Sequence, residues 1–218
     1  MYKRQTQDEV FRATIGHTLV YTVINVAIQV FGGLLFAILL SRIKKGRVAL
    51  QTLYYIPVVI SSVAICQIFT KLLSVTPTGI VNQVLSFIDP SLKLMEWISN
   101  PQISLYVTAF VEAYKYLGLY MVIFYAALIG VPDELGEAAL IDGCTRWKTF
   151  WSVVFPLLKP TIATVAIIDA MAFWNDYLLP SLVLGRKELY TLPIATQAFY
   201  GTYSTDLGSV SYTHLTLP

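Results

Sequence analysis

Charged residues are scarce in this sequence. They make up 13% of its 218 residues, whereas 56% are hydrophobic. A soluble domain carries about a quarter charged residues, and the mean hydropathy of +0.64 also indicates a chain that lies in a membrane. The formal net charge of +2 is too small to indicate a nucleic-acid partner. We therefore expect a membrane protein that binds no nucleic acid.

Motifs for catalysis and nucleotide binding are also missing. The sequence contains no Gly-rich loop ending in Gly-Lys-Ser/Thr, no His-Glu-x-x-His and no nucleophile elbow. Its two cysteines, Cys66 in an apolar run and Cys144 in a polar loop, do not form a disulfide framework. We therefore expect no catalytic residue, no metal site and no bound cofactor, and a transport subunit rather than an enzyme.

Long apolar runs are the main feature that the sequence does have. A membrane-spanning helix needs about 20 mostly apolar residues, and the segments 15–40, 48–73, 103–131 and 160–184 qualify. They are too long for the strands of a membrane barrel, which alternate over about 10 residues. The sequence predicts an all-α, polytopic membrane helix bundle with four spans. In the loop after the second span, the segment 79–88 (GIVNQVLSFI) predicts one short helix.

Basic residues predict how the spans are oriented. The loop after the first span contains four of them and no acid (Arg42, Lys44, Lys45 and Arg47). Short loops rich in Lys and Arg stay in the cytoplasm. The polar loop after the third span is then cytoplasmic too, and the loops 74–102 and 185–209 face outward.

The polar loop after the third span predicts a bent pair of helices. Pro132 and Asp133 suit a helix start, Gly143 suits a left-handed C-terminal residue, and Thr145 suits the cap of a second helix. An apolar stripe follows at helical spacing (Trp147, Phe150, Trp151 and Val154). We expect the first helix to project from the membrane and the second to lie against it. Alternatively, the loop is only an interfacial amphipathic helix that joins two spans.

The register of this loop, EAALIDGCTRWKTFWSVVFP at 137–156, resembles the EAA loop of ATP-driven importer permeases. In that pattern, Glu-Ala-Ala is followed by three residues, Gly, nine residues, an aliphatic residue, any one residue, a second aliphatic residue and Pro. Val153 and Phe155 stand where the family usually has Ile and Leu. The resemblance implies that a cytoplasmic coupling loop docks on a separate ATPase subunit, with its key positions at Glu137, Ala138, Ala139, Asp142, Gly143 and Pro156.

Further motifs resemble the carbohydrate branch of the family, most closely the smaller maltose-type permease subunit. They are HTLVYTV at 17–23, with His17 in place of the usual Asn, the Gly-x-x-Asn turn at 79–82, FWNDYLLP at 173–180 and ELYTLP at 188–193. The resemblance implies an importer of a sugar or sugar derivative in a bacterial or archaeal cytoplasmic (inner) membrane. Its implied partners are membrane lipid, a second permease subunit, an extracytoplasmic solute-binding protein and ATP-binding cassette ATPase subunits that hold ATP and Mg.

Other classes of protein make different predictions. A secondary transporter or channel needs no ATPase and would spread polar residues over several spans without a helical docking loop. A membrane-embedded enzyme needs a clustered nucleophile or metal set, which the sequence lacks.

Ionisable residues within spans indicate a pathway or a specific partner. Glu112 and Lys115 lie three residues apart, so they either neutralise each other or serve a pathway. Asp176 follows Trp174 and Asn175, and an aromatic ring with an amide and a carboxylate suits sugar hydroxyls. Interhelical hydrogen bonding is the alternative for Asp176. The candidate translocation path therefore comprises Glu112, Trp174, Asn175 and Asp176.

Both ends of the sequence are expected to be foreign. The segment 1–5 (MYKRQ) can be encoded GTG TAT AAG AGA CAG, and the reverse complement of that string encodes the segment 210–214 (VSYTH) in a shifted frame. This form is that of a transposon adapter. We expect residues 1–5 and 210–218 to be adapter-derived and residues 6–209 to be a truncated transmembrane permease domain.

Overall fold

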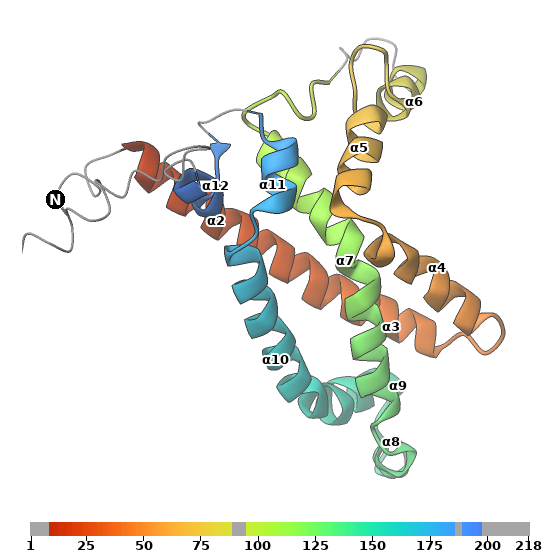
Figure 1. Ribbon diagram of the computed structural model, residues 1–218. Coiled ribbons are helices and arrows are strands. Elements are labelled where there is room, and N and C mark those ends of the chain that lie inside the picture. Colours follow the sequence, from red (N-terminus) through yellow and green to blue (C-terminus); the bar gives the residue numbers. More distant parts are fainter. Residues whose placement is uncertain (1–8, 89–94, 186–188, 198–218) are drawn as a thin grey trace, which may run out of the picture. The chain divides into compact units, whose positions relative to one another are not determined.

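The computed structural model describes residues 9–88, 95–185 and 189–197, and in these residues helices are joined by turns and loops, without strands (Figure 1). The expected all-α fold is therefore confirmed for this part of the chain. The terminal segments 1–5 and 210–218 lie outside the described residues.

Three helical segments are long and apolar enough to cross a membrane: Ala13–Ser41, Ser104–Ile129 and Arg146–Trp174. The first runs through α2 (Glu9–Ala27), the π-helix η1 (Ile28–Gly32) and α3 (Gly33–Ser41), and the second is α7 (Ser104–Ile129). These two agree with the predicted spans 15–40 and 103–131. The third runs through α9 (Arg146–Thr149), the π-helix η2 (Phe150–Val154) and α10 (Phe155–Trp174).

The boundaries predicted for the last span, 160–184, are wrong at both ends. The helix already begins at Arg146 and it ends at Trp174, before the separate helix α11 (Leu178–Val183). A proline lacks the N–H group and its ring opposes the carbonyl four residues earlier. Pro156 is the second residue of α10, and the wider π turns of η2 before it let the helix continue through it.

The predicted span 48–73 is a broken pair in the structure, because α4 (Arg47–Val59) and α5 (Ser62–Leu72) do not form one helix. Ile60 between them is extended, with φ −70° and ψ 139°. The pair is sharply bent and passes the length and hydropathy test only as two helices taken together. The described residues therefore contain three spans, or four if this pair counts as one.

Backbone contacts divide the chain into two compact units, and each of the three long segments passes from one to the other. Unit 1 comprises the described parts of Met1–Thr22, Ser62–Ala109 and Ala172–Pro218, and unit 2 comprises Val23–Ser61 and Phe110–Met171. Unit 1 contains α5, α6 (Ile80–Ile88), α11 and α12 (Leu192–Gln197), and α11 packs against α5. Helix α6 confirms the short helix predicted in 79–88.

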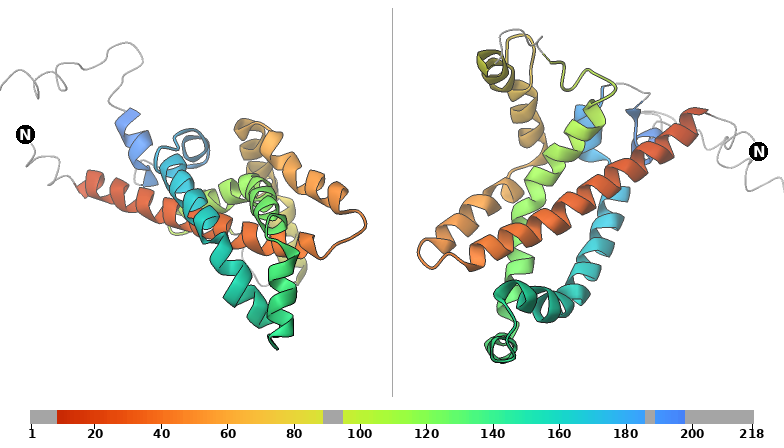
Figure 2. Two further views of the ribbon diagram at one scale, coloured as in Figure 1. Left: turned by 90° about the horizontal axis from the view of Figure 1, so that it is seen from below. Right: turned by 180° about the vertical axis from the view of Figure 1, so that it is seen from behind.

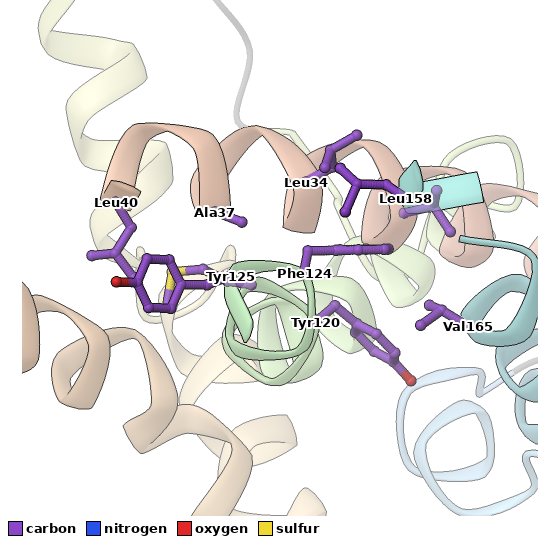
Figure 3. Close-up of a cluster of buried hydrophobic side chains, with 10 residues drawn as sticks. Leu34, Ala37, Leu40, Tyr120, Phe124, Tyr125, Leu158 and Val165 are labelled. Atoms are coloured by element: carbon purple, nitrogen blue, oxygen red, sulfur yellow. The ribbon is translucent and has the colours of Figure 1, made fainter. Parts of the chain in front are cut away.

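Unit 2 is organised around an apolar core where α3, α7 and α10 meet (Figure 3). Phe124 of α7 is completely buried and points toward Leu34 and Leu158 from the other two helices. The remaining members are Val30, Ala37, Leu40, Tyr120, Met121, Tyr125 and Val165. Complete burial of one large apolar side chain stabilises the fold by roughly 1.5–3 kcal/mol.

Two glycines let helices of unit 2 approach closely. A Cβ atom at Gly33 would lie 2.9 Å from Cβ of Tyr120, and one at Gly118 would lie 2.6 Å from the carbonyl carbon of Tyr54. Real Cβ atoms do not come closer than 3.0 Å. Helix α7 therefore needs glycine at 118 to lie against α4.

Candidate functional site

The turn that follows α8 (Asp133–Ile141) has the geometry that the sequence predicted. Gly143 has φ +79°, in the left-handed region, where glycine has no steric penalty. Its N–H donates to the carbonyl of Leu140 over 3.1 Å, and the N–H of Cys144 donates to that of Ala139 over 2.9 Å. These two bonds form a Schellman motif, which ends α8 and sets the direction of the chain that leaves it. Helix α8 lies beyond the C-terminal end of α7 (Figure 2).

Thr145 caps the next helix, as predicted, because its Oγ1 accepts a hydrogen bond from the N–H of Lys148 over 3.3 Å. The sequence placed this second helix apart from the last span, and that separation is wrong. The helix continues through η2 into α10 as one helical segment from Arg146 to Trp174. Any displacement of the turn at Gly143 therefore acts directly on a membrane-crossing helix.

The surface of α8 combines polar and apolar side chains. Glu137, Ala138 and Asp142 are exposed, and Ile141 exposes 86% of its surface. Ala139, by contrast, is 7% exposed, and α8 packs against α9 and η2. Successive helical residues point about 100° apart, so only one of the two alanines is available for another protein. Of the two alanines, Ala138 is therefore exposed and Ala139 packs within the chain.

The aromatic stripe after Thr145 is only partly a packed face. Trp147 and Trp151 remain 70% and 46% exposed, with their rings 5.8 Å apart in an edge-on arrangement. The ring of Trp151 lies 4.9 Å from that of Phe155. Val154 packs against the core of unit 2. The stripe thus divides into an inward aliphatic part and an exposed aromatic part.

A pocket of about 650 Å³ lies in unit 2 beside α8. Two arginines and two acids line it (Arg42, Asp133, Glu137 and Arg146), together with apolar side chains such as Ile38, Leu128 and Phe150. Glu137, the first residue of the Glu-Ala-Ala motif, therefore borders a recess that also contains positive charge. Such a recess suits a protruding polar or charged side chain of a partner.

Unit 2 also buries polar side chains within its membrane-crossing helices. Gln29, in the π-helix η1, and Asp169 have exposed fractions of 0%. Neither side chain reaches hydrogen-bond geometry with the described residues, although Tyr120 lies close enough to interact with Asp169. Sequence analysis did not select Gln29 or Asp169 for the path. The sequence signal that could have found them is an amide or carboxylate side chain within a long apolar run.

Of the predicted path residues, Glu112 lies on α7 and is 4% exposed. Lys115 on the same helix is 5% exposed. Its Nζ donates to the hydroxyl of Tyr116 over 3.2 Å and lies 4.6 Å from the centre of that ring. Mutual neutralisation of Glu112 and Lys115 stays a prediction, as does a path role for Glu112.

The other predicted path residues lie in unit 1, at the end of α10 and directly after it. Trp174 and Asn175 are exposed. Asp176 is half-buried, and its Oδ2 accepts a hydrogen bond from the hydroxyl of Tyr21 over 2.9 Å. The structure therefore gives Asp176 a hydrogen bond to a helix of another segment, close to the alternative of interhelical hydrogen bonding, although Asp176 itself lies between α10 and α11.

Three sequence motifs of unit 1 come together around the start of the first span. Besides the Tyr21–Asp176 bond, Thr18 Oγ1 accepts from the N–H of Leu192 over 2.7 Å. The ring of Tyr21 also meets that of Phe173 edge-on, with centroids 6.3 Å apart. The segments 17–23, 173–180 and 188–193 are thus linked through their described residues, although they lie far apart in the sequence.

The described residues contain no group of three or more His, Cys, Asp or Glu side chains placed to hold a metal ion. What this part of the molecule offers is a capped turn, a recess of mixed charge and buried polar groups within spans.

Comparison with known proteins adds a family and several relatives. The family of binding-protein-dependent transport system inner membrane components matches residues 11–217. The probable starch degradation products transport system permease protein AmyC of Thermoanaerobacterium thermosulfurigenes is 44% identical over 111 residues, which cover 48% of this chain and 40% of that protein. The arabinooligosaccharides transport system permease protein AraP of Halalkalibacterium halodurans is 30% identical over 170 residues, with 76% and 53% covered. The chain thus spans about half or less of these two relatives.

A solved structure is also similar over nearly the whole chain. It is the crystal structure of a bacterial ABC transporter involved in the import of the acidic polysaccharide alginate. The TM-score is 0.80 at 25% sequence identity, and the similarity covers 97% of this chain and 72% of that one.

Proposed function

Because the chain belongs to the family of binding-protein-dependent transport system inner membrane components, we propose that it is a permease subunit of an ATP-driven importer for a sugar or sugar derivative. Its partners are a second permease subunit, an extracytoplasmic solute-binding protein and ATPase subunits that bind ATP and Mg. The permease lies in a bacterial or archaeal cytoplasmic membrane, and hydrolysis of ATP belongs to its partners.

The turn at Gly143 is the observation that carries this proposal. A Schellman motif closes α8. Ile141, Ala138 and Glu137 are exposed on this helix, and Glu137 borders a recess that two arginines also line. An exposed aliphatic side chain next to charged groups is typical of the centre and rim of a docking surface. The ATPase subunit binds α8 there as a coupling helix.

Continuity of the helix supplies the mechanism. The segment Arg146–Trp174 has no break between the capped turn and the far end of α10. Closure of the ATPase subunits moves α8, the rigid turn moves Arg146, and the whole span tilts with it. Thr145 and Gly143 keep the angle between α8 and the span constant, because each fixes one side of the turn.

The solute path involves the exposed Trp174 and Asn175 at the end of α10. Names of relatives support the carbohydrate class, since AmyC is a transport permease for starch degradation products and AraP for arabinooligosaccharides. An indole ring stacks on the apolar face of a sugar, and an amide bonds to its hydroxyls. Tyr21 holds Asp176 close to this pair by a hydrogen bond to one carboxylate oxygen, Oδ2.

The membrane topology follows from the same proposal. The broken pair α4 and α5 crosses the membrane as one span, which gives four spans in the described residues. The basic loop after α3 and the α8 turn then both face the cytoplasm, where ATPase subunits bind. The segment between α5 and α7 faces outward.

Cysteine crosslinking tests the docking turn directly. Cys66 and Cys144 are first replaced by alanine, Ile141→Cys is introduced, and the chain is co-expressed with the ATPase encoded beside its gene. We expect a crosslink between this cysteine and the ATPase subunit. Ile80→Cys, also exposed but on α6, is the matched control and should give none.

A secondary transporter or channel predicts a different result. It would drive uptake by an ion gradient, bind no ATPase and give no crosslink at Ile141→Cys. That outcome would replace the importer proposal.

A further inference from the structure

The buried Asn82 ties one face of helix α6 to neighbouring segments of unit 1. Asn82 is 1% exposed, and its Nδ2 donates to the carbonyls of Ser74 over 3.1 Å and of Met95 over 3.2 Å. Its Oδ1 accepts from the N–H of Met95 over 3.2 Å and from Nε1 of Trp97 over 3.1 Å. All the hydrogen-bonding capacity of this amide is used inside the chain. The orientation of α6 is thereby set.

The opposite face of α6 is entirely apolar and exposed. Its members follow the spacing i, i+4, i+7 and i+8, and their exposed fractions are 60% for Ile80, 52% for Val84, 90% for Phe87 and 71% for Ile88. The helix Ile80–Ile88 contains no charged residue. Four large apolar side chains on one face of a fixed helix indicate contact with an apolar environment.

The position of α6 indicates what that environment is. A Cβ atom at Gly79 would lie 2.6 Å from the carbonyl oxygen of Lys71 and 2.7 Å from the carbonyl carbon of Leu72. The residue before α6 therefore lies directly on the last turn of α5, and α6 follows beyond the end of that helix (Figure 1). Helix α5 belongs to the apolar pair with α4. A helix fixed to the end of a membrane-embedded helix lies where the bilayer meets water.

We propose that α6 lies in the membrane–water interface, with the face of Ile80, Val84, Phe87 and Ile88 inserted among the acyl chains of the lipid. Interfacial helices insert such a face by about 5–10 Å. The side chains are three aliphatic groups and one phenyl ring, without the Tyr, Trp or Arg that anchor protein interfaces. Because α6 has no Lys or Arg, burial of its apolar face drives the insertion, and attraction to anionic lipid headgroups is not required.

The proposal goes beyond the transport function and does not depend on the solute or the ATPase. Asn82 connects the inserted helix to Ser74, Met95 and Trp97. Insertion of α6 therefore fixes the depth of the segment that joins α5 to α7, and holds the end of α5 at the membrane surface during transport.

Nitroxide accessibility tests the proposal residue by residue. In the full chain with Cys66 and Cys144 replaced by alanine, spin labels are attached separately through Val84→Cys, Phe87→Cys and Ile88→Cys. The chain is reconstituted in vesicles of phosphatidylethanolamine and phosphatidylglycerol. Collision with oxygen, which concentrates in lipid, is compared with collision with a water-soluble nickel chelate.

Two further positions calibrate the scale. Leu35→Cys, 55% exposed on α3, reports lipid, and Gln102→Cys, exposed in a loop, reports water. We expect the three α6 labels to match Leu35→Cys in oxygen collision and to collide at least fivefold less with nickel than Gln102→Cys does. The values should persist in vesicles of phosphatidylcholine alone, since α6 has no charge.

Each other outcome overturns the proposal. Nickel collision at the level of Gln102→Cys would mean that the face is in water. Low collision with both reagents would mean that protein covers it, and dilution with unlabelled chain would reveal a second copy by the loss of dipolar broadening. The measurement is repeated with the co-purified partner subunits, and low collision only in their presence would assign the face to a partner. Transport activity enters none of these readouts, so failure here leaves the proposed function intact.

Discussion

The hydroxyl of Tyr21 donates a 2.9 Å hydrogen bond to Oδ2 of Asp176, joining the start of the first span to the turn that follows the last one. Tyr21 has an exposed fraction of 0%, so its hydroxyl needs a partner inside the protein. Asp176 supplies it, and the two residues are 155 positions apart in the sequence. A carboxylate placed beside a candidate sugar site thus has a structural partner.

Removal of this hydrogen bond should loosen the turn after α10. We predict that Tyr21→Phe lowers stability by roughly 1.5–3 kcal/mol, the usual value for a hydrogen bond to a charged group. Thermal unfolding of Tyr21→Phe, Asp176→Asn and the double variant measures the coupling between the two. Additive effects in this cycle would mean that the bond contributes nothing.

Replacement of Gly143 should uncouple ATP hydrolysis from transport. A side chain in the left-handed region costs about 1–2 kcal/mol, and Gly143→Val should relieve that strain by reorienting α8. Uptake by the assembled transporter should fall while solute still binds the outer protein. Gly136→Ala, inside α8 and with nothing within 4 Å of its added Cβ, should transport normally. Unchanged uptake by Gly143→Val would refute the coupling role of the turn.

Gly118 should tolerate no side chain at all. A Cβ there would overlap the carbonyl group of Tyr54, and forcing α7 away from α4 should cost about 1–3 kcal/mol. Gly16→Ala is the matched control because nothing lies within 4 Å of its added Cβ. In a helix that exchange should stabilise by about 0.5–1 kcal/mol. Opposite shifts in melting temperature are therefore expected, and equal shifts would contradict the close approach.

Loss of the Asn82 side chain should open the segment between α5 and α7. Asn82→Ala leaves Nε1 of Trp97 and the carbonyl of Ser74, both in half-buried residues, without this partner, at a cost below the roughly 1–3 kcal/mol of a fully buried group. Limited proteolysis should then cleave this segment faster than in the unchanged protein. Gln83→Ala, which removes one exposed hydrogen bond to Thr78, should leave the cleavage rate nearly unchanged. Equal rates in the two variants would contradict the role of Asn82.

Thiol labelling should establish the topology. A cysteine at Lys45 or Lys148 should be protected from an impermeant reagent added outside intact cells, whereas one at Gln102 should react. Permeabilised cells, in which all three should react, provide the control. Labelling at Lys148 from outside would place α8 on the wrong side for an ATPase.

Local geometry within the polar loop was readable from the sequence. Gly143 and Thr145 occupy the positions that their residue types predict, because a left-handed residue and a helix cap are decided by neighbours within a few residues. The spans 15–40 and 103–131 were predictable for a similar reason, since length and hydropathy are sums over one segment. The Glu-Ala-Ala register predicted the family, and the family match over residues 11–217 confirms it.

Other features depend on contacts between distant segments, and only the tertiary structure decided them. Hydropathy gave one span for 48–73, whereas the chain breaks at Ile60. Hydropathy alone also placed the start of the last span at 160, whereas the helix begins at Arg146 and continues through η2 and Pro156. The partner of Asp176 was one of many polar side chains in the sequence, and folding selected Tyr21. Sequence thus determined which segments are helical and apolar, and packing determined where those helices end and which buried polar groups meet.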